Sequence, residues 1–149
     1  MLLTTLLMIN VKLLFTLAIV VIILVACVTR FKGNNTPALP APAYTTVGVQ
    51  EFQNIITDPD VGIQLLDVRS RDEFDDGHIA GAQLVDVNES AFVERAMAVL
   101  DIQRPVAVYC RSGRRSSRAA NQLAAQGFKV TNLDGGIMAW EDAGKALVK

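Results

Sequence analysis

The chain has 149 residues, enough for one folded domain with an additional segment, and its formal net charge is −1. This balance, without a long run of lysine and arginine, excludes binding to nucleic acid through a general basic field. The two cysteines, Cys27 and Cys110, are too few for a disulfide framework and lie in unlike contexts, so we expect a separate role for each. One histidine and isolated cysteines do not form a metal-ligand set, and no metal or other cofactor is predicted.

Residues 1–26 are predicted to be a signal peptide or a membrane anchor. Positions 13–28 carry no charge and Lys12 precedes them, as in a secretory signal. The segment from Leu24 to Cys27 resembles the bacterial lipoprotein box, in which cleavage leaves the cysteine as the new first residue and as the site of lipidation. Because several acyl chains hold a protein firmly at a membrane, this pattern predicts a membrane-anchored lipoprotein on the periplasmic side.

An uncleaved transmembrane helix is the alternative interpretation of the same segment. Its apolar residues are numerous enough to span a bilayer, for which about 20 suffice. Arg30 and Lys32 follow the apolar run, and by the positive-inside rule they favour a cytoplasmic domain. The chain would then be a single-pass inner membrane protein, and the sequence leaves both alternatives open.

Residues 27–43 are predicted to be a tether and a linker rich in proline and alanine. Three prolines lie between Thr36 and Ala43, without apolar periodicity. Such segments favour an extended polyproline II spacer. We therefore expect the folded domain to occupy residues 44–149.

Strand and helix patterns alternate in this second part of the chain. In chain order, the apolar periodicities and the Gly and Pro punctuation predict a strand at 45–47, a helix from 49 that stops at 58–59, a strand at 63–68, a short helix at 71–76, a weak strand at 83–87, a helix at 92–100, a strand at 105–109, a helix at 116–126, a strand at 129–133 and a final short helix after 135–136. This alternation is typical of an α/β domain with a mainly parallel five-stranded sheet and helices on both faces.

Cys110 ends a predicted strand and precedes a loop that contains Gly113 and leads into a helix. In parallel sheets, ligands gather at the carboxyl ends of the strands. Backbone N–H groups that converge there, together with a helix N-terminus, would stabilise a nucleophilic thiolate at the mouth of the sheet. Several guanidinium groups follow within eight residues and are hard to bury, which favours a functional cysteine over one that only packs in the core. They belong to Arg111, Arg114, Arg115 and Arg118.

Four segments make the chain resemble the rhodanese family over residues 45 to about 144. They are Leu66-Asp67-Val68-Arg69; Glu73-Phe74 with Gly77-His78-Ile79-Ala80-Gly81-Ala82, where Ala80 replaces the family's usual proline; the Cys110 loop; and Leu133-Asp134-Gly135-Gly136-Ile137 with Trp140. The resemblance implies a rhodanese-like three-layer sandwich, and it is closest to the exported single-domain rhodaneses of the phage-shock type.

The resemblance also implies a thiosulfate sulfurtransferase. Cys110 would take sulfane sulfur from thiosulfate, a polysulfide or a persulfide, become a persulfide itself, and pass the sulfur to cyanide or a thiol. The amides of the following loop would cradle the outer sulfur, and its arginines would steer anionic donors. The substrate-binding residues implied in this way are Arg111, Ser112, Gly113, Arg114, Arg115 and Ser116.

Other residues in the motifs are expected to be structural. Asp67 and Arg69 are expected to form an ion pair or a hydrogen-bonded brace between a strand end and the loops, rather than to take part in catalysis. His78 is expected in a turn rather than in a Cys–His dyad. Trp140 is expected to pack in the core rather than to rim the site.

Three other functions are alternatives to sulfur transfer. Phosphatases and arsenate reductases with related folds place a histidine directly before the cysteine and a phosphate-binding arginine six residues after it, where this chain has Tyr109 and Ser116. Scaffold members of the family commonly lack the cysteine, which this chain keeps. A persulfide carrier or binding module for a protein partner is the alternative that stays open, and the sequence does not identify that partner.

Overall fold

The computed structural model describes Ile19 and residues 44–149 of the chain. Apart from Ile19, the predicted signal or anchor at 1–26, the lipidation site at Cys27 and the linker at 27–43 lie outside the described residues. Within the described part, no helix has both the length and the apolar character needed to cross a bilayer.

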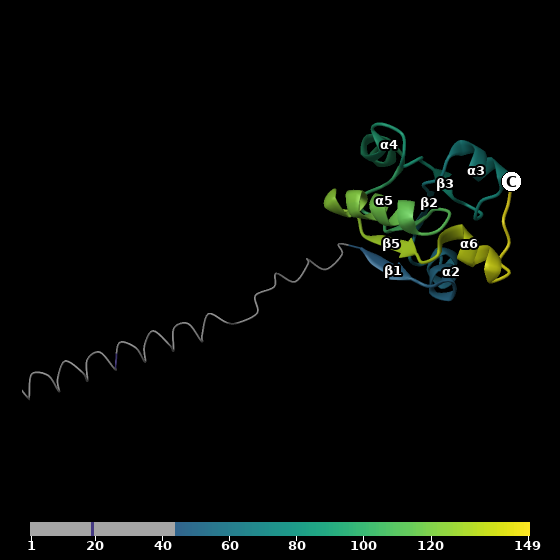
Figure 1. Ribbon diagram of the computed structural model, residues 1–149, viewed down its shortest axis with the longest axis horizontal. Helices are drawn as coiled ribbons and strands as arrows, with labels where there is room; N and C mark the ends of the chain where they lie inside the picture. The colour runs from purple at the N-terminus through teal and green to yellow at the C-terminus, as the bar shows by residue number, and fades with distance from the viewer. Residues whose placement is uncertain (1–18, 20–43) are drawn as a thin grey trace, which may run out of the picture. The chain divides into compact units, whose positions relative to one another are not determined.

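A five-stranded parallel sheet forms the centre of the domain (Figure 1). Every pair of neighbouring strands in it is parallel, and the strand order is β1-β5-β4-β2-β3. The strands are β1 (Thr45–Val47), β2 (Gln64–Asp67), β3 (Gln83–Leu84), β4 (Val106–Tyr109) and β5 (Val130–Leu133). This arrangement confirms the predicted α/β class and the number of strands.

Helices cover both faces of the sheet and give the domain three layers (Figure 1). Core residues of α4 and α5 pack on one face, and core residues of α2 and α6 pack on the other. The helices are α2 (Val49–Thr57), α3 (Arg71–Asp76), α4 (Phe92–Val99), α5 (Arg114–Ala125) and α6 (Gly136–Asp142). The predicted covering of both faces is confirmed.

The side chains of β4 show how the two cores are built. Val106 and Val108 point toward the α4–α5 side, whereas Ala107 and Tyr109 point toward the α2–α6 side, because successive side chains of a strand alternate between its faces. Trp140 lies in the second core, 5% exposed, with its ring edge-on to that of Phe52 and its Nε1 donating to the Ala146 carbonyl at 3.1 Å. Core packing of this tryptophan was predicted and is confirmed.

Most predicted boundaries agree with the structure to within one residue, and two elements differ by more at one end. The strand expected at 83–87 ends at Leu84, although Val85 and Val87 still donate single hydrogen bonds to Asp67 and Val68. The helix expected from Ser116 begins two residues earlier, at Arg114. Gly113 has a φ of 90°, which turns the chain sharply enough for the helix to begin at the next residue.

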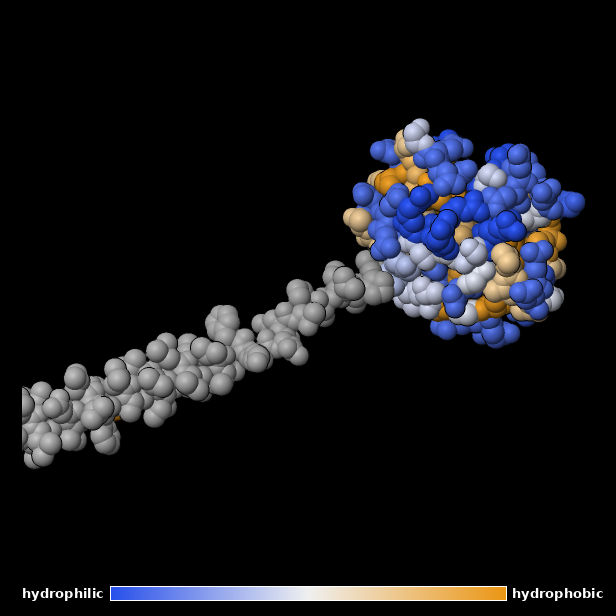
Figure 2. Space-filling model, viewed as in Figure 1, coloured by the Kyte–Doolittle hydropathy of each residue, from blue (hydrophilic) through white to orange (hydrophobic). Residues whose placement is uncertain are grey.

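The surface of the domain is mostly hydrophilic in the view of Figure 2. The most hydrophilic residues in this view gather over α5, between α4 and α3. The segment of α5 that follows the Cys110 loop carries Arg114, Arg115 and Arg118.

Candidate active site

Cys110 follows the last residue of β4, at the carboxyl edge of the sheet. The parallel register aligns Tyr109, the last residue of β4, with Asp67, the last residue of β2. In a parallel sheet all carboxyl ends meet at one edge, and the loops that follow β2, β4 and β5 therefore surround the cysteine. The helix α5 begins four residues after it in the chain.

The thiol of Cys110 is buried rather than exposed at the mouth of the sheet. Cys110 is 1% exposed and belongs to the core on the α4–α5 side, which differs from the expectation of an open thiolate. Its polar surroundings nevertheless match the expectation, because the backbone amides of Ser112, Gly113 and Ser116 point at the sulfur. Burial raises the pKa of Cys110, whereas these amides and the Ser116 hydroxyl lower it. The lowering outweighs the raising, so the pKa lies below the ordinary value of a cysteine.

Ser116 has one hydroxyl proton and two acceptors within reach. Its Oγ lies 3.4 Å from the Cys110 sulfur and 3.0 Å from the Gly113 carbonyl oxygen. That carbonyl also accepts from the Ser117 amide at 2.9 Å and from the Ser117 hydroxyl at 2.8 Å. Because a carbonyl oxygen has two lone pairs, Ser117 can satisfy both, which leaves the Ser116 proton to the sulfur.

The first turn of α6 holds the Cys110 loop from the other side. The amide of Ile137 donates to the Cys110 carbonyl at 2.8 Å, and the amide of Met138 donates to the Arg111 carbonyl at 3.1 Å. Gly136 makes this approach possible, because a Cβ at this position would overlap the Cys110 carbonyl oxygen and lie 2.7 Å from that of Arg111. Its φ of +61° also favours glycine.

Asp67 and Arg69 form a buried ion pair beneath the site. Arg69 donates through Nε and Nη2 to the carboxylate at 2.7–3.0 Å, and its Nη2 also donates to the Gly77 carbonyl at 2.7 Å. The guanidinium lies 5.7 Å from the centre of the Tyr109 ring. Burial raises the pKa of Tyr109, and the nearby Asp67 carboxylate raises it further, so the phenol stays neutral and accepts a hydrogen bond from the Ile79 amide. The ion pair thus connects the end of β2 to the turn that follows α3.

Glu73 and Arg115 form a second ion pair, which the sequence patterns did not reveal. The two guanidinium nitrogens of Arg115 donate to the two carboxylate oxygens of Glu73 at 2.7 and 2.6 Å, across 42 positions of sequence. Glu73 also closes a capping box with Ser70 at the start of α3. The hydrogen bonds from Arg115 are the main cause that lowers the pKa of Glu73 to about 2. The Ser-x-x-Glu spacing of the capping box is visible in the sequence, but the distant arginine is not.

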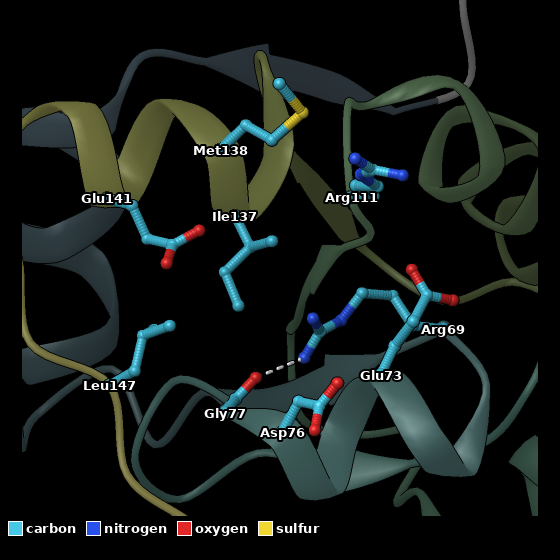
Figure 3. A pocket seen from close by; sticks show the side chains of 9 residues that line it. All are labelled: Arg69, Glu73, Asp76, Gly77, Arg111, Ile137, Met138, Glu141 and Leu147. Atoms are coloured by element: carbon cyan, nitrogen blue, oxygen red, sulfur yellow. Dashed lines mark hydrogen bonds between the residues drawn. The ribbon is translucent and has the colours of Figure 1, made fainter.

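A cavity of about 390 Å³ lies beside the Cys110 loop (Figure 3). Arg111, the residue next to the cysteine, lines it together with Arg69 and Glu73. The remaining lining residues are Asp76, Gly77, Ile137, Met138, Glu141 and Leu147. In Figure 3 the Arg69 guanidinium reaches the Gly77 carbonyl, and the carboxylate of Glu141 faces the hollow from α6. The cavity is therefore lined by both positively and negatively charged side chains. Arg111 is exposed, and among the lining residues it is the one next to Cys110 in the chain.

The other residues predicted for the site are distributed around the same loop. Ser112 is exposed and contributes its amide, and Arg114 is exposed on the first turn of α5. His78 does not contact the cysteine loop in the way a dyad requires; its Nδ1 lies 3.1 Å from the Phe74 carbonyl oxygen, and its ring stacks on that of Phe74 at 3.7 Å. Its amide and carbonyl pair with Val148, as expected for a residue in a structural turn.

Comparison with known proteins places these features in one family. The model of the rhodanese-like domain matches residues 48–143. Thiosulfate sulfurtransferase 18 of Arabidopsis thaliana is 38% identical over 93 residues, which are 54% of this chain and 68% of that protein. The thiosulfate sulfurtransferase GlpE of Shewanella oneidensis is 41% identical over 83 residues, which are 54% of this chain and 78% of that protein.

Solved structures agree with this match. The rhodanese-like domain of an Anabaena protein superposes with a TM-score of 0.61 at 29% identity, covering 72% of this chain and 79% of its own. A rhodanese-related protein from Thermoplasma volcanium gives a TM-score of 0.61 at 26% identity, covering 70% of this chain and 98% of its own. The fold and the cysteine loop therefore agree in pointing to one family.

Proposed function

Because the chain belongs to the rhodanese-like family, we propose that it is a sulfurtransferase in which Cys110 carries sulfane sulfur as a persulfide. The observation that carries this proposal is the convergence of the Ser112, Gly113 and Ser116 amides and the Ser116 hydroxyl on the Cys110 sulfur. Such donors stabilise a thiolate and, after transfer, the outer sulfur anion of a persulfide. The relatives named thiosulfate sulfurtransferase support thiosulfate as a donor.

The proposed reaction has two half-reactions that share the enzyme persulfide. The Cys110 thiolate attacks the outer sulfur of thiosulfate; a new S–S bond forms, the S–S bond of thiosulfate breaks, and sulfite leaves with the electron pair. A thiolate or cyanide then attacks the outer sulfur of the persulfide and leaves as a persulfide or as thiocyanate. The Cys110 thiolate is regenerated with its electron pair, so the cycle needs no external oxidant or reductant.

Exposed arginines beside the loop support an anionic donor. A thiolate and thiosulfate repel each other, and positive charge near the point of attack offsets that repulsion. Arg111 and Arg114 are both exposed, and they flank Ser112 and Gly113, two of the three residues whose amides face the sulfur. Since Cys110 is 1% exposed, the atoms that cover the sulfur must move aside when a donor enters.

Steady-state turnover tests the proposal. The purified full chain, given thiosulfate and cyanide, is expected to produce thiocyanate with ping-pong kinetics, because the persulfide separates the two half-reactions. Cys110→Ser should abolish turnover, whereas Cys27→Ser should retain it and serves as the matched control. Turnover that survives in Cys110→Ser would rule out the assigned nucleophile. Formation of a stable persulfide without turnover would favour a carrier for a protein partner.

We also propose that residues 1–26 direct the domain to a membrane, with Cys27 as a lipidation site and the domain on the periplasmic side. The basis is the sequence pattern alone: an uncharged run that ends in Leu24-Val25-Ala26-Cys27. Mass spectrometry of the mature N-terminus tests it, and the expected first residue is a lipidated Cys27. An intact peptide that spans residues 13–26 would instead support the uncleaved anchor.

A further inference from the structure

A second cavity lies along α5, directly after the Cys110 loop. Its volume is about 530 Å³, and we call it the arginine cavity after the residues that line it, Asn88, Arg114, Arg115 and Arg118. None of these lining residues is acidic. Its three arginines belong to α5, the helix over which the most hydrophilic surface of Figure 2 lies. A concave site lined by guanidinium groups is suited to carboxylate or sulfonate ligands, which arginine binds through paired N–H donors.

Two of the three arginines, Arg114 and Arg118, take part in no ion pair among the described residues. Arg118 donates through Nη2 to the Val87 carbonyl at 3.1 Å and to the Asn88 amide oxygen at 2.8 Å, and both acceptors are neutral. Arg115 is different, because Glu73 neutralises it. The contacts of Arg118 hold its guanidinium in place without neutralising it, as a preorganised anion site requires.

The arginine cavity and the reactive sulfur are neighbours. Arg115 lines the cavity, and its pKa is raised mainly by its hydrogen bonds to Glu73 and further by the charges of Cys110 and Asp86. The next residue, Ser116, has its Oγ 3.4 Å from the Cys110 sulfur, so the cavity adjoins the turn that holds the sulfur. Arg114 and Arg118 are four residues apart on α5, so they share one helix face about one turn, or ~5.4 Å, apart. The face runs along α5 away from the turn at Gly113, so a donor that spans the sulfur and Arg118 has to be longer than a compact ion such as thiosulfate.

We propose that the arginine cavity binds a carboxylate of an organic sulfur donor whose reactive sulfur lies at Cys110. The donor class is an organic persulfide or thiosulfonate with a carboxylate beyond its sulfur. This inference rests on the proposed function and adds a second recognition site to it. Three acidic groups lie nearby. Glu89 and Glu94 line the neighbouring pocket that Arg118 also lines, and Glu89 is paired with Arg95. The third is Asp86, whose charge acts on Arg115. Its Oδ1 accepts the Asn88 amide at 2.8 Å, and it does not line the cavity.

A pair of matched donors tests the subsite on the full chain. Benzenethiosulfonate and 4-carboxybenzenethiosulfonate carry the same transferable sulfur and differ by one carboxylate. At constant ionic strength, the wild type is expected to show about tenfold higher kcat/KM for the carboxylated donor, the gain expected of one charge-assisted contact. In Arg118→Gln this ratio should fall to about one, mainly through a higher KM for the carboxylated donor.

Two further variants keep the test decisive. Arg104→Gln removes the same charge near the amino end of β4, where Arg104 donates to the Gly62 carbonyl, and it should retain both the activity and the ratio. Arg114→Gln removes a cavity arginine that is not in an ion pair, and it should lower the ratio even if Arg118→Gln disturbs the loop at Asn88. A ratio of one in the wild type, or a tenfold ratio kept in both cavity variants, would overturn the subsite. Absence of sulfur transfer from every donor would instead overturn the proposed function.

Discussion

At the scale of single residues, the account depends on how one buried sulfur is held as an anion. Cys110 has almost no exposed surface, and burial alone would raise the pKa of its thiol. Three amides and the Ser116 hydroxyl reverse that effect. The hydroxyl is the only one of these donors that a side-chain substitution can remove without changing the backbone.

Ser116→Ala is therefore expected to raise the pKa of Cys110. The Ser116 hydroxyl is one of the groups that lower this pKa, and without its hydrogen bond the thiolate is less stable. The measurement is the rate of alkylation of Cys110 against pH, in which the inflection moves to higher pH. Ser112→Ala is the matched control, because Ser112 acts on the sulfur through its backbone amide, which the substitution keeps. The pH profile of Cys110 alkylation in this variant should be like that of the wild type.

Ser117→Ala should have the same sign of effect although Ser117 does not contact the sulfur. Without its hydroxyl, the Gly113 carbonyl has a free lone pair, and the Ser116 proton turns to it from Cys110. We expect a rise in the pKa of Cys110 of about half the size seen in Ser116→Ala. Ser117→Thr keeps the hydroxyl and should restore the wild-type profile. An unchanged profile in Ser117→Ala would show that the Ser117 hydroxyl is not what keeps the Ser116 proton on the sulfur.

At the scale of the elements, the junction of α6 with the Cys110 loop is the tightest contact of the site. Gly136→Ala should destabilise the domain by about 2–4 kcal/mol, because the new Cβ meets the carbonyls of Cys110 and Arg111 at a positive φ. Gly144→Ala is the matched control: its φ is +69°, but nothing lies within 4 Å of the added Cβ. It should cost only about 1 kcal/mol.

Chemical denaturation of the two glycine variants gives both free energies of unfolding. Equal losses in Gly136→Ala and Gly144→Ala would mean that backbone strain, rather than the close approach to the loop, sets the cost. A larger loss in Gly136→Ala should be accompanied by lower sulfur transfer, because the displaced carbonyls belong to the loop that surrounds Cys110.

The ion pair between α3 and α5 makes stability depend on pH. Arg115 lowers the pKa of Glu73 to about 2 from an ordinary value of 4.5, so the pair stabilises the folded state fully above about pH 4.5 and less as the pH falls toward 2. Glu73→Gln keeps a capping side chain but loses the charge. It should reduce the free energy of unfolding by about 1 kcal/mol at pH 7, a modest value because the pair is partly exposed.

Urea denaturation of the wild type and Glu73→Gln between pH 7 and pH 2 checks this sign. The difference between the two proteins should shrink as the pH falls below about 4.5. A difference that is the same at all pH values would show that ionisation of Glu73 does not stabilise the folded state, which would contradict the ion pair.

At the scale of the whole molecule, the sequence predicted what local patterns determine. The apolar run of β4, the glycine after Cys110 and the alternation of elements were sufficient for the fold class, the five strands and the place of the cysteine. The pairing of Glu73 with Arg115 was not predictable, because it joins helices 42 positions apart. The burial of Cys110 was not predictable either, since it depends on core residues of α4 and α5 that are far from it in the sequence or follow it on another element.

The central claim is that Cys110 holds transferred sulfur, and intact-mass spectrometry after incubation with thiosulfate tests it most directly. The account predicts a mass increase of one sulfur atom, located on the peptide that contains Cys110, absent in Cys110→Ser and removed by cyanide. A protein that keeps its original mass with thiosulfate and with organic thiosulfonates, or that carries the added sulfur on another residue, would contradict it.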